Sequence, residues 1–314
     1  MSRSETPVDR GETPPAPARL SRQTLGMGLG FIGVVIFGGT LPATRLAVAG
    51  LDPFFITVGR AAASGLLSAA LLLILRRRWP SLRQIRTMTI CIATLVFGFS
   101  GLIALAMQTV PASHGGVVLG ILPLTMAATA SLLLGERPSL RFWLLAGLGT
   151  TVVVTFALHD SGGDIALGDA YLFLAAISTS IGYVCSADLS RQMPGWEVIS
   201  WILVLALPLT LPLAVWLWPA NPGAVPASAW AAFAYVSVFS MFVGFFAWNA
   251  GLAMGGVARV SQVQLLQTFV TLGLSAIING EHVGLSTIAV AALVVAIVAT
   301  GRNARITQKV PDAG

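Results

Sequence analysis

The chain has 314 residues, of which 56% are hydrophobic and only 10% are charged, and its formal net charge is +6. A soluble protein of this length would carry charged faces on its helices, so this composition excludes an ordinary soluble domain. Apolar runs of about 20 residues, the length that crosses a bilayer as a helix, recur along the chain. A membrane β-barrel would show short alternating segments instead. The composition therefore predicts an all-α membrane protein.

Two polar tails flank the apolar part of the chain. Residues 1–23 are rich in arginine and proline and cannot bury enough apolar surface to order themselves, so we expect a disordered cytosolic tail. An uncleaved first helix fits better than a secretory signal, because the apolar run that follows is long enough to span a membrane. Residues 302–314 are expected to form a second cytosolic tail.

Between the tails, the hydropathy pattern predicts ten transmembrane helices. Five fall in residues 24–160 and five in residues 161–301, which we expect to be two five-helix repeats. The expected helices are 25–48, 54–75, 88–107, 115–134, 140–158, 167–189, 198–218, 230–253, 257–278 and 285–300.

Landmarks of the first half recur in the second half at a constant offset of 145 positions. They are the pairs Gly135-Glu136 and Gly280-Glu281, Ala106-Met107 and Gly251-Leu252, and Leu140 and Leu285. One offset shared by several landmarks is typical of two copies of one structural unit.

The distribution of basic residues predicts the orientation of the helices. In a ten-span arrangement every lysine and arginine except Arg45 and Arg60 falls on one side, which is expected to be the cytoplasm. Both termini are then cytoplasmic, and the basic charge reflects topology rather than a nucleic-acid partner. An odd number of spans separates Glu136 from Glu281, so the second repeat is inverted relative to the first. Inverted repeats are typical of secondary transporters.

Several segments resemble the EamA-type transporters of the drug/metabolite transporter superfamily, over residues 25–300. They are FGGTLPATRLAV…DPFFITVGRAAA in the first two helices, LPL…LLLGERPSL after helix 4 begins, and WNAGLAMGGVARVSQVQLLQ…NGE in helices 8 and 9. The resemblance implies ten helices in two inverted five-helix repeats around a central cavity. It also implies export or exchange of small metabolites.

Proline positions predict local irregularity in two helices. Pro42 and Pro123 lie inside predicted spans and are expected to kink helices 1 and 4. The family resemblance implies a matching proline in helix 9, thirteen residues before Glu281, where this chain has Thr268. We therefore expect helix 9 to be straighter than helix 4.

The strongest pattern for a transport pathway lies in helix 9. Ser261, Gln264, Thr268, Thr271 and Ser275 recur at steps of three and four residues, so they share one helix face. Because polar groups are costly in lipid, this face should turn toward a cavity or toward other helices. The alternative is hydrogen bonding between helices, worth roughly 0.6–2 kcal/mol per contact. Gln262 and Gln267 lie off this face and are weaker candidates.

Arg45 in helix 1 and Arg60 in helix 2 are the basic residues outside the cytosolic segments. An arginine at the centre of a membrane helix costs at least about 2.5–3.5 kcal/mol. Either residue is therefore a candidate to attract an anionic group, such as a substrate carboxylate. The alternatives are that the arginine extends to the interface or pairs with Asp52. For Arg45 the alternatives are favoured, whereas for Arg60 the question stays open.

Other candidates are polar or aromatic residues inside spans. Trp248 and Asn249 in helix 8 are candidates for a cavity wall, as is Tyr183 in helix 6 with its neighbours Ser178 and Ser180. Glycine pairs four residues apart predict close helix packing at Gly26/Gly30, Gly116/Gly120 and Gly251/Gly255.

The sequence shows no pattern typical of an enzyme. The three histidines lie at the predicted exterior ends without metal-ligand spacing, and no nucleophile or phosphate-loop motif is present. We therefore expect no catalytic residue, no cofactor and no metal. No aspartate or glutamate falls in the middle of a span, so the driving force of transport stays open.

Together these patterns predict a secondary transporter that exports or exchanges a small polar or amphipathic metabolite, amino-acid-like or drug-like, by alternating access. The alternatives are an uptake or facilitated-exchange carrier and, outside transport, a membrane receptor or a lipid-modifying enzyme. The expected partners are the small-molecule substrate and the lipid bilayer, without nucleic acid, and the chain is compatible with a homodimer. The expected location is the inner cell membrane.

Overall fold

The structure is a computed structural model that describes residues 22–134, 137–160, 166–255, 263–302 and 306–307. Apart from a short antiparallel contact between β1 (Arg137–Pro138) and β2 (Ile306–Thr307), these residues form helices and their connections. The predicted all-α fold class is therefore confirmed for the described residues. The predicted tails lie almost entirely outside them.

The helices of the first half are α1 (Arg22–Gly38), α2 (Thr40–Val48), α3 (Pro53–Ile74), α4 (Leu82–Cys91), the π-helix η1 (Ile92–Phe99), α5 (Ser100–Thr109), α6 (Ala112–Val118), the 3-10 turn η2 (Leu119–Ile121), α7 (Leu122–Leu134) and α8 (Leu140–Asp160). Those of the second half are α9 (Leu167–Leu189), α10 (Gly195–Trp216), the 3-10 turn η3 (Pro222–Ala224), α11 (Ala227–Ala234), the π-helix η4 (Tyr235–Val243), α12 (Gly244–Gly255), the 3-10 turn η5 (Gln264–Leu266), α14 (Gln267–Asn279) and α15 (Leu285–Arg302).

In three places, consecutive elements join into one long helix. Thr24–Val48 joins α1 and α2, Leu82–Thr109 joins α4, η1 and α5, and Ala227–Gly251 joins α11, η4 and most of α12. By length and composition, 7 described helices can cross a membrane, and three shorter apolar helices complete the series: Trp143–His159, Gln264–Asn279 and Leu285–Thr300. The described residues thus form a multi-pass bundle, and its ten crossings stay a prediction.

The two halves of the chain build the same series of elements. α1 and α9 begin 145 positions apart, and the same offset relates the starts of α4 and α11, η2 and η5, α7 and α14, and α8 and α15. This is the offset of the sequence landmarks. The repeat therefore extends from short motifs to nearly every helix.

The two halves share a local irregularity where Pro123 is matched by Thr268, and the greater straightness of helix 9 stays a prediction because residues 256–262 lie outside the described residues. A 3-10 turn precedes Pro123 in one half, and a 3-10 turn precedes Thr268 at the matching place in the other. Both residues are the second residue of the helix that follows. A backbone N–H at the start of a helix has no partner within that helix, so proline is tolerated there without being needed.

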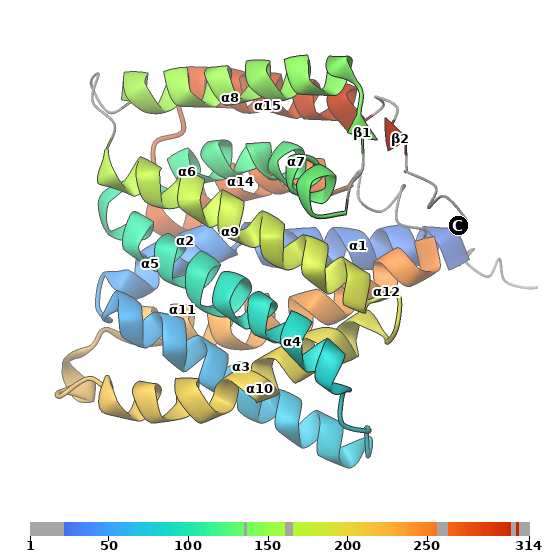
Figure 1. The fold of residues 1–314 in the computed structure, drawn as a ribbon. Coiled ribbons are helices and arrows are strands. Elements are labelled where there is room, and N and C mark those ends of the chain that lie inside the picture. Colours follow the sequence, from blue (N-terminus) through green and yellow to red (C-terminus); the bar gives the residue numbers. More distant parts are fainter. Residues whose placement is uncertain (1–21, 135–136, 161–165, 256–262, 303–305, 308–314) are drawn as a thin grey trace, which may run out of the picture.

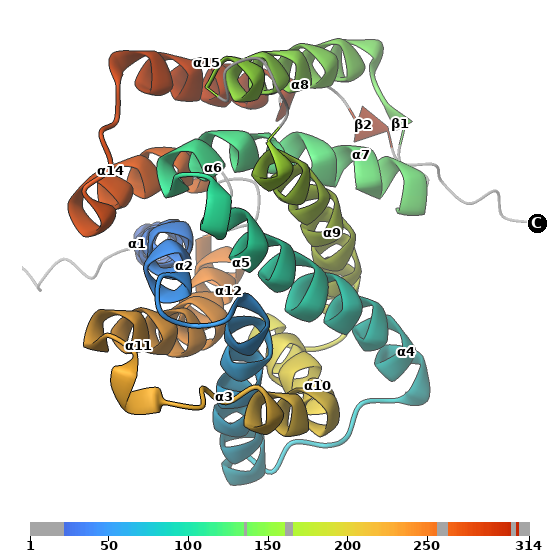
Figure 2. The ribbon, with the colours of Figure 1, turned by 90° about the vertical axis from the view of Figure 1, so that its left-hand side faces the viewer.

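The helices pack in layers (Figure 1, Figure 2). α8 and α15 lie side by side along one edge of the bundle, α3 and α10 lie side by side along the opposite edge, and the other long helices fill the space between. The start of α1 and the end of α15 lie at the same end of the bundle (Figure 1).

Glycines allow the closest helix crossings in these layers. A Cβ added at Gly251 of α12 would come within 2.6 Å of the Gly30 nitrogen and 2.9 Å of the Gly26 oxygen of α1. A Cβ at Gly116 would come within 2.8 Å of the Thr271 side chain on α14. These contacts agree with the close packing that the glycine spacing predicted.

The first long helix is locally irregular at Gly39, between α1 and α2. Pro42 has no N–H, so the carbonyl of Gly38, four residues earlier, lacks its usual helical donor. The Thr271 hydroxyl of α14 donates to that carbonyl at 2.9 Å, and the Tyr235 hydroxyl of η4 donates to the Ile36 carbonyl at 2.8 Å. The predicted irregularity at Pro42 is therefore present, and two other helices satisfy the backbone beside it.

Candidate functional site

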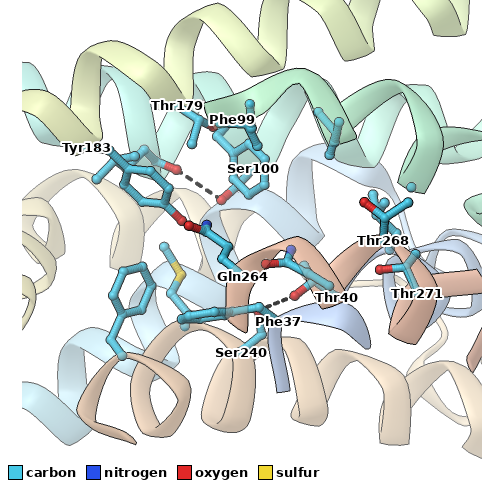
Figure 3. A pocket seen from close by; sticks show the side chains of 18 of the residues that line it. Phe37, Thr40, Phe99, Ser100, Thr179, Tyr183, Ser240, Gln264, Thr268 and Thr271 are labelled. Atoms are coloured by element: carbon cyan, nitrogen blue, oxygen red, sulfur yellow. Dashed lines mark hydrogen bonds between the residues drawn. The ribbon is translucent and has the colours of Figure 1, made fainter. Parts of the chain in front are cut away.

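A cavity of about 100 Å³ lies in the interior of the bundle, lined by helices of both halves (Figure 3). At about 10–15 Å³ for each water molecule, this space has room for several waters or for a small metabolite. Its described hydroxyl and amide residues are Thr40, Ser100, Thr179, Ser240, Gln264, Gln267, Thr268 and Thr271. Its described aromatic residues are Phe37, Phe99, Tyr183 and Phe245. The wall is therefore amphipathic.

Irregular backbone brings several of these side chains to the wall. Ser240 lies in the π-helix η4, and its hydroxyl is hydrogen-bonded at 2.8 Å to that of Thr40, which directly follows the irregular turn at Gly39. Gln264 lies in the 3-10 turn η5, where its side chain and that of Tyr183 point toward one another (Figure 3). π-helical turns inside α-helices are frequent at functional sites.

Arg60, in the first half of α3, is the charged residue among the described residues of the wall. Only 3% of its surface is exposed. Its Nη2 donates to the Ser240 hydroxyl at 3.4 Å, a long hydrogen bond, and its Nε and Nη1 have no partner among the described residues. The Ser64 hydroxyl, one turn further along α3, donates to the Ser237 carbonyl of η4 at 2.6 Å and holds the two helices together beside the guanidinium.

A second polar cluster lies where the α2–α3, α5–α6 and α14–α15 connections meet, and we name it the Glu281 end. The Glu281 carboxylate accepts hydrogen bonds from the backbone N–H groups of Ala112 and Ser113, both at 2.8 Å, and so caps the start of α6. Arg45 of α2 lies 3.8 Å from this carboxylate and donates to the Met107 and Val110 carbonyls at 2.7 and 2.8 Å.

The bonds to Glu281 determine the direction of its pKa shift. Burial alone would raise the pKa of this carboxyl group, but hydrogen bonds from the Ser113 side chain and backbone, the Ala112 backbone and the Asn279 side chain outweigh it. The net result is a pKa below its ordinary value, so the charged form is favoured where it caps α6.

A buried histidine–aspartate contact continues the Glu281 end toward α9. His114 Nε2 lies 2.6 Å from Asp169 Oδ1, and their side chains are 3% and 0% exposed. The His114 ring stacks on Phe156 of α8 at 5.1 Å between centroids. Asp169 lies in the first turn of α9, where the helix dipole favours a carboxylate. This contact joins α6 to α9 across the repeat boundary.

Both halves of this architecture match one family. The EamA-like transporter family is found twice, in residues 24–158 and in residues 166–300. The chain belongs to the EamA-like transporter family. It is 45% identical over 284 residues to the uncharacterized transporter YdeK of Bacillus subtilis (strain 168), a match that covers 90% of this chain and 99% of that protein.

A solved structure described as "Crystal structure of protein" shares the fold, with a TM-score of 0.59 and 20% identity over 90% of this chain and 97% of that one. The resemblance identified in the sequence is thus confirmed. The EamA-like chain is a multi-pass integral membrane protein, and its family and its relative indicate a membrane transporter.

Five of the residues proposed from the sequence meet at the cavity of this EamA-like protein: Arg60, Tyr183, Gln264, Thr268 and Thr271. They come from α3, α9, η5 and α14, so their meeting depends on the tertiary fold. Of the other stripe residues, Ser275 is buried further along α14, and Ser261 lies outside the described residues. Gln262, expected to lie off the stripe, is also outside the described residues. Gln267, expected to lie off the stripe, also lines the cavity.

Three proposed residues lie elsewhere in the EamA-like fold. Trp248 packs its backbone against Gly33 of α1, and Asn249 contacts Gly195 at the start of α10, so neither is among the described cavity residues. Arg45 lies at the Glu281 end. Its acidic partner is Glu281 and not Asp52, which was one of the alternatives considered. Asp52 accepts from the N–H groups of Phe54 and Phe55 and caps α3.

No specific signal in the sequence pointed to Thr40, Ser240 or Thr179, because Thr40 and Ser240 are isolated hydroxyl residues in apolar or mixed runs and Thr179 is one of three adjacent hydroxyl residues. Thr179 lies between Ser178 and Ser180, which were considered as candidates. In the fold Ser178 donates to the Thr94 carbonyl and Ser180 is hydrogen-bonded to Thr125, while Thr179 faces the cavity. The rotation of α9 decides which of three adjacent hydroxyls is available, and only packing determines that rotation.

Proposed function

We propose that this protein is a secondary transporter that exports or exchanges a small polar or amphipathic metabolite across the plasma membrane by alternating access, with the central cavity as its substrate site. One observation carries the proposal: matching positions of the two repeats line the same cavity. The pairs, each 145 positions apart, are Leu95 and Ser240, Val96 and Met241, Ser100 and Phe245, Leu119 and Gln264, Gly120 and Leu265, and Leu122 and Gln267.

Such a cavity is what alternating access requires. Transporters built from inverted repeats bind substrate between the related halves and expose it to each side in turn by moving one half against the other. Support for inversion here comes from α1 and α9, matching elements that begin at opposite ends of the bundle (Figure 1). The 3-10 turns η2 and η5 support it too, because they place the same irregular backbone on both sides of the cavity.

We propose ten crossings with both termini in the cytoplasm and the Glu281 end outside. Single cysteines introduced as Arg78→Cys and His282→Cys, in a variant lacking Cys91 and Cys185, test the orientation. An impermeant maleimide added to intact cells should label the second position and leave the first unlabelled. The reverse pattern would contradict the proposed orientation.

Flux in proteoliposomes tests the function itself. Purified full-length protein is reconstituted, a metabolite mixture is enclosed, and its release is followed by mass spectrometry. We expect protein-dependent release of at least one small metabolite, and faster release when the same compound is present outside if the carrier exchanges. A receptor or a lipid-modifying enzyme would give no protein-dependent flux. Accumulation of an external metabolite inside the vesicles would favour the uptake carrier.

A matched pair of variants connects the flux to the cavity. Gly120→Leu places a large side chain at a position where even a Cβ would lie 3.1 Å from Val294 and 3.4 Å from Thr268. Leu174→Ala changes an exposed position of α9 on the outside of the bundle. We expect the first variant to lose flux while it still purifies as a monodisperse protein, and the second to keep it.

A further inference from the structure

The cavity wall carries one cation and no described counter-charge. Among the described residues that line it, Arg60 is the charged side chain, and none is an aspartate, glutamate, lysine or histidine. The elements around the guanidinium supply hydroxyl, aromatic and aliphatic groups instead. The described lining residues therefore give the site a positive electrostatic character.

A buried charge without a partner is unfavourable, and protein interiors pair such charges or hydrogen-bond them fully. Arg60 is 3% exposed, yet two of its three guanidinium nitrogens have no partner among the described residues. The third makes a 3.4 Å bond to a serine hydroxyl that is already bonded to Thr40. The guanidinium therefore keeps most of its donor capacity for a group that enters the cavity.

A second buried group in the same cavity also lacks a partner among the described residues. Thr179 of α9 is 1% exposed, and its hydroxyl has no hydrogen-bond partner among the described residues. Aromatic rings cover other parts of the wall, where Phe37 and Phe245 meet edge to face at 5.1 Å. The site thus offers one cation, a free hydroxyl and a large apolar surface.

We propose that the substrate is a small monoanion, with a carboxylate that binds Arg60 and an apolar body that packs against the aromatic wall. Guanidinium and carboxylate match in charge and in planar geometry. A cationic substrate is disfavoured because no described wall residue offers it a carboxylate. The inference rests on the proposed function, and within that function it selects anionic metabolites over cationic drug-like compounds.

Matched ligands that differ in one group test the charge preference. Binding of phenylacetate, phenylacetamide and 2-phenylethylamine to the purified full-length protein is compared by calorimetry, and isovalerate, isovaleramide and isoamylamine repeat the test on a smaller skeleton. We expect the carboxylate to bind roughly tenfold or more tightly than the amide, and the amine most weakly. Equal binding, a preference for the amine, or no carboxylate binding on either skeleton would overturn the inference.

Two arginine variants assign the preference to its residue. In Arg60→Gln the carboxylate and the amide should bind with equal affinity. Arg83→Gln, at an exposed position of α4, should still bind the carboxylate more tightly. Loss of the preference in both variants, or in neither, would overturn the role of Arg60. Protein-dependent flux of a neutral compound together with no carboxylate preference would leave the transporter intact and remove only this inference.

A measurement without ligand gives an independent answer. Arg60→Met keeps an unbranched apolar side chain that reaches about as far as Arg60 Nε, and it removes a charge that the described residues do not compensate. In detergent, the unliganded variant should therefore melt at the same temperature as the wild type or higher. A clear decrease in melting temperature, beyond that of Arg83→Gln, would mean that Arg60 holds the fold together through a partner, and would overturn the inference.

Discussion

Arg45 and Arg60 lie on consecutive membrane helices, yet their surroundings are opposite. Arg45 donates to two backbone carbonyls and lies beside a carboxylate, and its side chain is 34% exposed. Arg60 is almost fully buried, and its closest described hydrogen-bond acceptor is 3.4 Å away. The first arginine connects the ends of several helices, and the second keeps its charge available to the cavity.

This difference separates structural charges from functional ones. At the Glu281 end each charged group has partners: Glu281 caps α6, Arg45 binds the end of α5, and Asp169 contacts His114. Removing one partner of such a satisfied group lowers the free energy of unfolding of the protein. In the cavity the polar groups are only partly satisfied, so their removal should alter transport more than stability.

The largest expected effect is on stability, from Asp169→Ala. The change leaves His114 without its 2.6 Å partner in a site closed to water, and removing one member of a buried polar pair costs about 3 kcal/mol. We expect a loss of that size in the free energy of unfolding, measured by SDS titration in mixed micelles. Asp188→Ala, near the other end of α9 and exposed, is the matched control and should change little. Equal losses in the two variants would remove the structural role of the contact.

A smaller loss is expected from Glu281→Gln. The neutral amide can accept one of the two backbone hydrogen bonds at the start of α6 but removes the charge that faces Arg45. Charge-assisted hydrogen bonds contribute about 1.5–3 kcal/mol and partial exposure reduces this, so we expect about 1–2 kcal/mol. His282→Gln, at the exposed neighbouring position, serves as the control in the same titration. An unchanged free energy of unfolding in Glu281→Gln would mean that the charge beside Arg45 contributes little to stability, which would contradict its structural role.

The same carboxylate predicts a pH dependence. Hydrogen bonds lower the folded-state pKa of Glu281 below the ordinary value of 4.5, although burial opposes them. Its contribution to stability is therefore complete above about pH 4.5 and is lost as the pH falls through the folded-state pKa. Melting temperatures from pH 7 to pH 3 should show the wild type losing its advantage over Glu281→Gln only below about 4.5. A constant difference over this range would contradict the assignment.

The class of protein, the repeat and part of the cavity could be predicted from the sequence, for identifiable physical reasons. Membrane helices require apolar length, so composition alone indicates them. Gln264, Thr268 and Thr271 share one face of a helix, and a polar face in a lipid environment must turn inward. These inferences need only one helix at a time, which is why they agree with the fold.

The remaining features depend on pairs of distant segments. Arg45 finds Glu281 and not Asp52 because the α14–α15 connection reaches the start of α6, while Asp52 is used by its own helix as a cap. Trp248 faces α1 because Gly33 leaves room for its backbone there. No periodicity within a single helix contains that information.

The smallest expected effect on stability is in the cavity, where Gln264→Leu and Thr271→Val form a contrast on one helix face. The Gln264 side chain makes no hydrogen bond with the described residues, so its replacement should change the free energy of unfolding by less than about 0.5 kcal/mol. The Thr271 hydroxyl satisfies the Gly38 carbonyl that Pro42 leaves without a donor, so its loss should cost about 1 kcal/mol.

Transport should respond in the opposite order. Gln264→Leu removes a polar group that faces the substrate space, so it should raise the apparent KM for the transported metabolite several-fold in proteoliposomes. Thr271→Val should change KM less, because its hydroxyl already serves the backbone. If Gln264→Leu transports normally, the wall near η5 does not contact the substrate, and Arg60 and Thr179 on the other helices become the polar contacts to test. If it unfolds instead, the partly satisfied groups of the cavity are structural after all, and the contrast between Arg45 and Arg60 loses its functional meaning.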